Sequence, residues 1–326
     1  MNLSIFSPKK DQCGLCTSHP FGQISDEEYK LHIDKKNNAR DEKIKDKCSA
    51  AGNQCHVITM DVESVKLSPI LKASALYYKT KLVVHNFTLY NLNTREATCY
   101  WWDETEGELV ASTFATCVVD FISRKFQDNL PIIIYSDGCT NQNRNAMMAN
   151  ALLQVSVSKK ITVFQKFLEK GHTQMECDSV HSAIESELKN KTIHVPSDYI
   201  KMCQNARNKQ PYETIYLSHN FFKDFSVRKN QAYPSIRSGS KAGDPCVTDL
   251  RALEYDPSGK IFYKLKHGDH EWNELPAKPI RSSDATNYPL YTERLQITAR
   301  KFKDLQELKS VIPIEHHMYY DSIPHK

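Results

Sequence analysis

Three acidic residues stand at points where strands end or a helix begins. Asp61 follows the apolar run 56–60, Asp137 follows the apolar run 131–136, and Asp178 opens a run with helical spacing. Carboxylates gathered without a basic partner repel one another, and a hard divalent cation removes that penalty. Two such ions about 3.5–4 Å apart can clamp the attacking and leaving oxygens of a phosphodiester displacement. We predict an Mg²⁺ or Mn²⁺ site here, with one ion or two, although each aspartate alone also fits a cap or turn.

Two histidines accompany the third aspartate. His181 lies three residues after Asp178, which places both side chains on one face of a helix. We predict that His181 and His172 assist catalysis by orienting a water molecule or moving a proton. A zinc hydrolase could also use His172, Asp178 and His181, but their spacing matches no HExxH pattern. That reading would leave Asp61 and Asp137 without a role.

Two polar segments could contact a substrate. A short amide-rich segment follows Asp137, and a basic segment that also contains Tyr233 and Phe225 lies near residue 230. Cations suit phosphate groups, and aromatic rings suit stacking on bases. The alternative for any single member is an ordinary solvated loop. We predict that the segments contact a nucleic acid, DNA in the first instance, through Asn141, Gln142, Asn143, Arg144, Lys223, Arg228, Lys229 and Arg237.

The N-terminal segment contains half of a metal site. Cys13 and Cys16 form a CxxC pair, a spacing typical of structural zinc sites. We predict His32 as the third ligand of a Zn²⁺ ion. The fourth ligand stays open between several residues and a position outside this sequence. A redox role is disfavoured because no βαβ pattern surrounds the pair, and two free cysteines remain the plain alternative. The candidates for the fourth ligand are His19, Cys48, Cys55 and His56.

The order of predicted elements indicates an α/β fold. Apolar and β-branched runs predict strands at 56–60, 81–92, 96–104, 131–136 and 161–168, and apolar residues at helical spacing predict helices at 107–126, 145–157 and 177–190. Before them, Ser25 and Glu28 have the spacing of a capping box that opens a charged helix. We therefore predict an arm over 1–55, a core of mixed sheet and helices over 56–195, and a C-terminal α+β extension over 196–326.

Composition sets broad limits on the function. The chain has 326 residues and a net charge of +4, which permits a nucleic-acid partner without requiring one. No apolar run approaches the ~18 residues of a membrane-spanning helix, and the first residues lack the apolar core of a secretory signal. Ten cysteines without such a signal predict reduced thiols. We expect an intracellular protein that does not associate with membranes.

Four segments together resemble a family of transposon-derived open reading frames from arthropods and other animals. They are "YYKTKLVVHNFTLYN" (77–91), "YWWDETEGE" (100–108), "YSDGCTNQNRN" (135–145) and "GHTQMECDSVHSAIE" (171–185). The resemblance covers nearly the whole chain and implies an RNase H-like, transposase-type core. It implies metal-dependent phosphodiester chemistry on nucleic acid, with Asp61, Asp137 and Asp178 as the acids. A nuclear location and assembly into oligomers also follow from it as expectations.

Glu63 departs from the family pattern and leaves two variants open. The segment Asp61-Val62-Glu63 is similar to the first motif of DEDD-type 3′–5′ exonucleases, in which a histidine also precedes the last aspartate, as His172 precedes Asp178 here. On that variant Glu63 would be a further Mg²⁺ or Mn²⁺ ligand. The other variant is a domesticated module that keeps the fold, binds nucleic acid or protein, and has lost catalysis.

Overall fold

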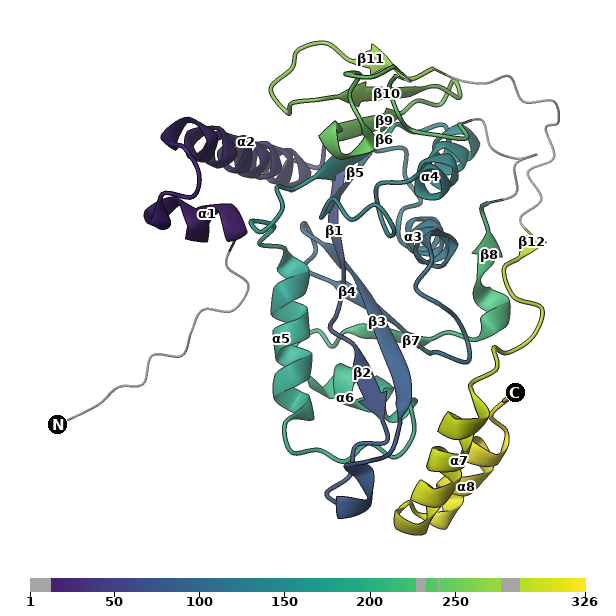
Figure 1. Cartoon of the computed structure of the whole chain (residues 1–326). Coiled ribbons are helices and arrows are strands. Elements are labelled where there is room, and N and C mark those ends of the chain that lie inside the picture. The colour runs from purple at the N-terminus through teal and green to yellow at the C-terminus, as the bar shows by residue number, and fades with distance from the viewer. Residues whose placement is uncertain (1–12, 227–232, 240, 277–287) are drawn as a thin grey trace.

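A mixed ten-stranded sheet forms the centre of the protein in the computed structural model, which describes residues 13–226, 233–239, 241–276 and 288–326 (Figure 1). Its strand order is β11-β10-β9-β6-β5-β1-β3-β4-β7, and β2 pairs with β3 outside this path. The strands are β1 (His56–Val62), β2 (Lys66–Ser68), β3 (Leu82–Asn91), β4 (Ala97–Asp103), β5 (Ile132–Ser136), β6 (Val163–Phe167), β7 (Glu213–Tyr216), β9 (Ala252–Tyr255), β10 (Ile261–Lys264) and β11 (Asn273–Glu274). A separate two-stranded sheet pairs β8 (Lys223–Asp224) with β12 (Tyr288–Pro289).

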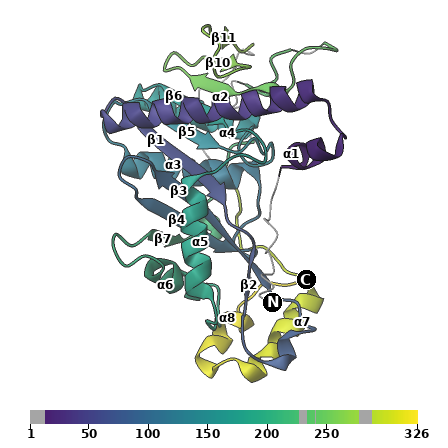
Figure 2. The same ribbon diagram turned by 90° about the vertical axis from the view of Figure 1, so that its left-hand side faces the viewer.

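Helices cover both faces of the large sheet. In Figures 1 and 2, α3 and α4 lie on one side of it, and α2 and α5 lie on the other. No helix in the described part has the length and apolar composition needed to cross a membrane. The helices are α1 (Gly14–Ser18), α2 (Asp26–Ala51), α3 (Ala111–Lys125), α4 (Ala146–Lys159), α5 (Glu176–Leu188), α6 (Asp198–Asn205), α7 (Ala299–Leu308) and α8 (His317–Asp321).

The five central strands confirm the predicted α/β core. Strand β1 pairs antiparallel with β3, β3 pairs antiparallel with β4, and the parallel pairs are β1–β5 and β5–β6. These are the order and directions that an RNase H-like sheet requires. Thr59 lies opposite Tyr135 in the parallel pair, so Asp61 and Asp137, each two residues further on, lie at the same edge.

Alternation along β1 separates the apolar core from the polar edge. Ile58 and Met60 belong to the large cluster that α3 and α4 complete, whereas Val57 belongs to the cluster that includes residues of α2 and α5. The Thr59 hydroxyl lies 3.5 Å from the sulfur of Cys177 on α5. Because side chains alternate along a strand, Asp61 shares the α5 side of the sheet with Thr59. The sequence of β1 therefore presents the Asp61 carboxyl toward the start of α5.

The arm docks on this same side through charged contacts. The capping box predicted at the start of α2 is present, with Ser25 and Glu28 each accepting a backbone N–H from the other. Near the other end of α2, the ammonium of Lys166 on β6 lies 2.5 Å from Glu42 and 2.6 Å from Asp46. The Tyr135 hydroxyl donates a 2.5 Å hydrogen bond to Asp46. A helix that is almost wholly charged is thus fixed by paired charges rather than by a broad apolar stripe.

The C-terminal extension joins the core sheet at both edges, and it also forms the small β8–β12 sheet. Strand β7 adds parallel to β4, and β9 adds antiparallel to β6. The acidic turn after β4 anchors the rest of the extension: Asp103 accepts the hydroxyls of Tyr216 at 2.6 Å and Tyr319 at 2.9 Å, and Glu104 lies 2.7 Å from Lys301. Asp103 and Glu104 of the "YWWDETEGE" segment therefore have structural partners.

Candidate carboxylate and metal sites

Asp137 and Asp178 both lie close enough to Asp61 to influence its carboxyl. Burial raises the pKa of Asp61 to about 7, and the neighbouring carboxyls of Asp137 and Asp178 add to the increase. Asp137 and Asp178 are therefore each near Asp61, and the three-carboxylate site stays a prediction. The three carboxyls do not converge on a single point: within the described residues, the group of Cys, His, Asp and Glu ligand atoms that come within 4.8 Å of one another lies elsewhere.

Local hydrogen bonds hold two of these carboxyls. One oxygen of Asp137 accepts the amide of Asn143 at 2.7 Å and the backbone N–H of Cys139 at 3.2 Å. The exposed Asp178 accepts the N–H of Met175 at 3.0 Å. Asp178 thus also has the helix-capping role that was the alternative for it. A cap leaves part of a carboxyl available, because each oxygen offers more than one acceptor site.

His181 lies beside the carboxyls but is neutral. Its Nε2 lies 3.1 Å from the hydroxyl of Thr88, which is the residue paired with Asp61 across β1 and β3. Burial lowers the pKa of His181 to about 4, with the nearby Lys66 adding to the effect. At pH 7 the ring therefore carries no charge. It can orient a hydrogen bond at this edge, and it has no stored proton to give.

Arg144 and Asn143 support the loop after β5 rather than face solvent. Arg144 is buried, stacks on the ring of Phe167 at 4.3 Å and donates to the carbonyl of Thr248 at 2.6 Å. Burial, with Arg251 beside it, lowers the pKa of Arg144 to about 10. A Cβ on Gly138 would lie 2.1 Å from the guanidinium, so any other residue here would displace Arg144. The prediction that Asn143 and Arg144 contact substrate is corrected by their burial, which withdraws both side chains from solvent.

The other predicted contact residues fall in different environments. Asn141 is exposed and Gln142 partly exposed, so both remain candidates beside Asp137. The backbone N–H and carbonyl of Lys223 both bond to the hydroxyl of Thr116 on α3, on the opposite face of the sheet from the acids. Arg237 is exposed. Tyr233 was expected to stack on bases but is fully buried, and its hydroxyl accepts the N–H of Ile261. Arg228 and Lys229 lie outside the described residues.

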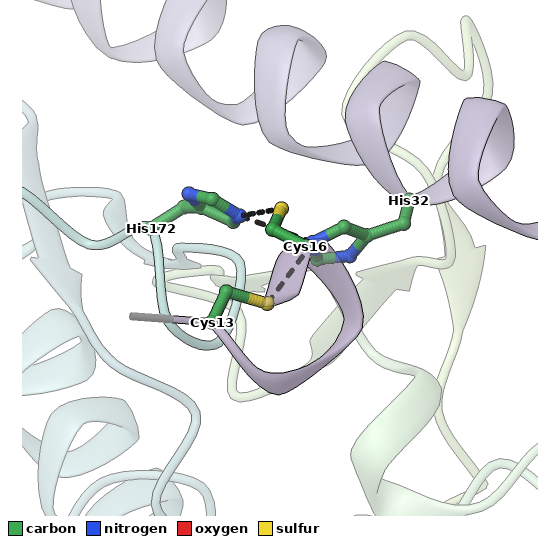
Figure 3. A group of neighbouring side chains, drawn as sticks. All are labelled: Cys13, Cys16, His32 and His172. Atoms are coloured by element: carbon green, nitrogen blue, oxygen red, sulfur yellow. Dashed lines mark hydrogen bonds between the residues drawn. The ribbon is translucent and has the colours of Figure 1, made fainter. Parts of the chain in front are cut away.

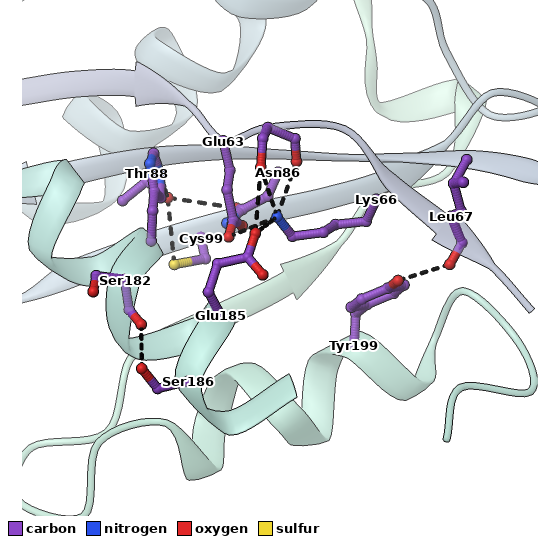
Figure 4. A network of polar contacts seen from close by, with 12 residues as sticks. Glu63, Lys66, Leu67, Asn86, Thr88, Cys99, Ser182, Glu185, Ser186 and Tyr199 are labelled. Atoms are coloured by element: carbon purple, nitrogen blue, oxygen red, sulfur yellow. Dashed lines mark hydrogen bonds and ion pairs between the residues drawn. The ribbon is translucent and has the colours of Figure 1, made fainter. Parts of the chain in front are cut away.

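Glu63 is paired with a basic side chain (Figure 4). Its carboxyl lies 3.0 Å from the ammonium of Lys66 and accepts the Asn86 amide at 2.8 Å. The same ammonium lies 2.5 Å from Glu185 on α5. A carboxylate already neutralised in this way gains little from a cation. The network therefore argues against Glu63 as a ligand for Mg²⁺ or Mn²⁺.

Two cysteines and two histidines form a compact group (Figure 3). Cys13 Sγ lies 3.2 Å from His32 Nε2, Cys16 Sγ lies 3.3 Å from His172 Nε2, and the two Nε2 atoms are 3.0 Å apart. Tetrahedral zinc with bonds of about 2.3 Å to sulfur and 2.0–2.1 Å to nitrogen sets its ligand atoms roughly 3.3–3.8 Å apart. The four residues could thus hold a metal ion after small adjustments. The predicted ligands Cys13, Cys16 and His32 are brought together.

His172 is the fourth member, and sequence reasoning assigned it elsewhere. It was predicted to assist catalysis because it precedes Asp178, and the structure turns it toward the cysteines instead. The turn at 169–172 is closed by a bond from the His172 N–H to the Glu169 carbonyl, and Gly171 in it has φ +76°. A glycine followed by histidine was the available signal. Cys16, which His172 contacts, lies 156 residues away along the chain.

Replacing Gly171 with alanine should disturb the Cys/His group. The new Cβ would lie 2.9 Å from the Cβ of Cys13, and the positive φ adds strain of about 1 kcal/mol. Gly259 is the matched control, since its φ is +86° and nothing lies within 4 Å of its added Cβ. We expect Gly171→Ala to weaken binding of the metal at least tenfold in competition with a chromogenic chelator. Equal affinities for Gly171→Ala and Gly259→Ala would contradict the close approach of Cys13.

One family model matches this chain. Residues 84–230 match a model described as "Domain of unknown function (DUF7869)". The matched region contains Asp137, His172, Asp178 and His181 but not Asp61 or the arm. Searches of the curated proteins and of the solved structures each found no match. The similarity names a related domain without naming a function.

Proposed function

We propose that this protein is a metal-dependent enzyme that cuts or transfers phosphodiester bonds in nucleic acid, DNA in the first instance. The observation that carries the proposal is the Asp61 carboxyl, which lies partly buried at the strand edge that Asp137 shares and has a pKa raised to about 7. Its strongest charged neighbours are carboxyls, an arrangement that is costly until a cation binds. Oxygen ligands of this kind suit Mg²⁺ or Mn²⁺.

Each residue of the proposed carboxylate site would have its own role in the reaction. Bound Mg²⁺ or Mn²⁺ would stabilise the charge that develops on the phosphate oxygens. Asp61, Asp137 and Asp178 would hold the cation, and Asn143 fixes the direction of the Asp137 carboxyl through its 2.7 Å bond. The neutral His181 would orient the attacking water or 3′-hydroxyl by accepting a hydrogen bond from it. Asn141, exposed in the same loop, would contact the scissile strand.

The exonuclease variant is disfavoured by two contacts. Its extra acid, Glu63, is paired with Lys66 at 3.0 Å. Its histidine, His172, faces Cys16 and His32 rather than the carboxyls. We therefore favour cleavage or strand transfer of the transposase type over stepwise 3′–5′ degradation. A substrate labelled at its 3′ end separates the two, because internal cuts release labelled fragments of several lengths whereas a 3′–5′ exonuclease releases the label on a single nucleotide.

A nuclease assay tests the proposal. The wild-type protein with Mg²⁺ or Mn²⁺ should cut single- or double-stranded DNA, and Asp137→Asn should lower the rate at least about a hundredfold because the cation is lost. Asp321→Asn, an acid paired with Lys309 on the C-terminal helix, is the control and should cut normally. Binding of DNA without cleavage under any metal condition would instead support the domesticated, non-catalytic module.

We propose further that the Cys/His group holds Zn²⁺. Two thiolate and two imidazole ligands in a partly buried group are a common structural zinc set. Protein purified without chelators should contain one equivalent of zinc by elemental analysis. His172→Ala should lose most of it, whereas the exposed His270→Ala should retain it. Zinc bound equally by both variants would show that His172 is not a ligand.

A further inference from the structure

The Cys/His group joins segments that are far apart along the chain. Cys13, Cys16 and His32 belong to the arm, and His172 belongs to the connection between β6 and α5. This connection, residues 168–175, leads directly to Asp178 on the first turn of α5. Its start is bonded to the end of β5, because the Leu168 N–H donates to the Ser136 carbonyl. A metal ion that holds this connection in place would therefore also affect the positions of Asp137 and Asp178, two of the proposed cation ligands.

Glu169 links the Cys/His group to the loop that carries Asp137. One of its carboxyl oxygens lies 3.8 Å from Nδ1 of His32, the ring nitrogen that points away from the cysteines. The other oxygen lies 3.6 Å from the Arg251 guanidinium. Arg251 and Arg144 both donate to the carbonyl of Thr248, at 2.9 Å and 2.6 Å. Arg144 in turn fills the space above Gly138, next to Asp137.

We propose that zinc in this group acts as a clasp, meaning that it fastens the arm to the β6–α5 connection. Glu169 is the positioning residue that couples this clasp to the carboxylate site. The coupling to the carboxylate site rests on the proposed function, whereas the zinc clasp itself does not. A carboxylate at the second nitrogen of a ligating imidazole fixes the orientation and tautomer of the ring and strengthens the metal bond. Glu169 is placed to do this for His32 while its other oxygen engages Arg251.

The rest of α2 should not need the clasp. The contacts of Lys166 with Glu42 and Asp46 hold the C-terminal part of this helix independently. Removal of zinc should therefore loosen residues 13–32 and 169–178 while the end of α2 stays docked. That pattern distinguishes a local clasp from a metal required for the whole fold.

Amide hydrogen exchange of the zinc-loaded and zinc-stripped protein tests the clasp. We expect at least a tenfold increase in exchange in residues 13–32 and 169–178 after stripping, with no change in residues 42–51. Glu169→Gln should weaken zinc binding 10- to 100-fold in competition with a chelator. Glu176→Gln is the matched control, since Glu176 pairs with Lys43 of the same arm but lies outside the group.

Affinity for Mn²⁺ tests the coupling. In the zinc-loaded protein, Glu169→Gln should bind Mn²⁺ at least fivefold more weakly than Glu176→Gln does. Unchanged exchange in 169–178 after stripping, or equal zinc affinities of the two variants, would overturn the clasp. A clasp that behaves as described in a protein that never cuts nucleic acid would instead refute only the proposed function.

Discussion

Asp61→Asn should stabilise the metal-free protein at pH 8 and abolish its activity. Burial and the neighbouring carboxyls raise the pKa of Asp61 from 3.8 to about 7 in the folded protein. The folded state therefore binds a proton that the unfolded state releases, so Asp61 costs stability as pH rises through this range. The cost is absent below pH 4, complete above pH 7, and amounts to up to roughly 4 kcal/mol. Asparagine resembles the protonated acid and avoids the cost at every pH.

Urea unfolding of both proteins at pH 4.5 and pH 8, without divalent cations, measures this effect. The stability gain of Asp61→Asn should be large at pH 8 and small at pH 4.5. Asp304→Asn should show the opposite sign at pH 8, because hydrogen bonds from Thr80, with the nearby Lys79, lower the pKa of Asp304 to about 2. Added Mn²⁺ should stabilise the wild type but not Asp61→Asn. A destabilised Asp61→Asn at pH 8 would contradict the crowding of carboxyls at this edge.

Lys166→Met should destabilise the protein by about 3–5 kcal/mol. The substitution removes the ammonium that pairs with Asp46 and Glu42, and the buried Asp46 carboxyl keeps its hydrogen bond from the Tyr135 hydroxyl. Removing one member of a buried ion pair exposes the other to the full cost of burial. Lowering the pH should recover part of the loss, because the two carboxyls can then be protonated.

Lys260→Met is the matched control for this substitution. Lys260 lies 3.0 Å from Glu274, but both side chains are about half exposed, so the pair contributes at most about 1 kcal/mol. Urea unfolding at pH 7 should show the large loss for Lys166→Met alone. Equal losses for both variants would mean that Lys166 does not fasten the arm to β6.

The sequence predicts the central sheet well because its signals are local. The apolar run 132–134 and the alternation along β1 depend on near neighbours, and parallel strands bring Asp61 and Asp137 to one edge without any knowledge of loops. The burial of residues that pack against distant parts of the chain was predicted less well. Arg144 and Tyr233 are both buried, and their partners Phe167 and Ile261 come from other parts of the chain.

The Cys/His group also contains one residue, His172, that could not be predicted from local signals. The spacing of Cys13 and Cys16 is a local signal, and His32 could be chosen because it lies on the next helix. His172 could not, since only the fold of the arm over the β6–α5 connection brings it there. Glu63 is a converse case: its partner Lys66 lies three residues later, and the strand ending after Val62 leaves the two able to pair.

Titration calorimetry with Mn²⁺ tests the central claim most directly. At pH 6.5, in two buffers with different ionisation enthalpies, wild-type protein should bind Mn²⁺ and release roughly three-quarters of a proton, since the pKa of Asp61 lies near 7 and metal binding requires the carboxylate. Asp61→Asn and Asp137→Asn should bind at least tenfold more weakly, and Asp61→Asn should release no proton. Wild-type protein that gives no binding heat in either buffer would contradict the account.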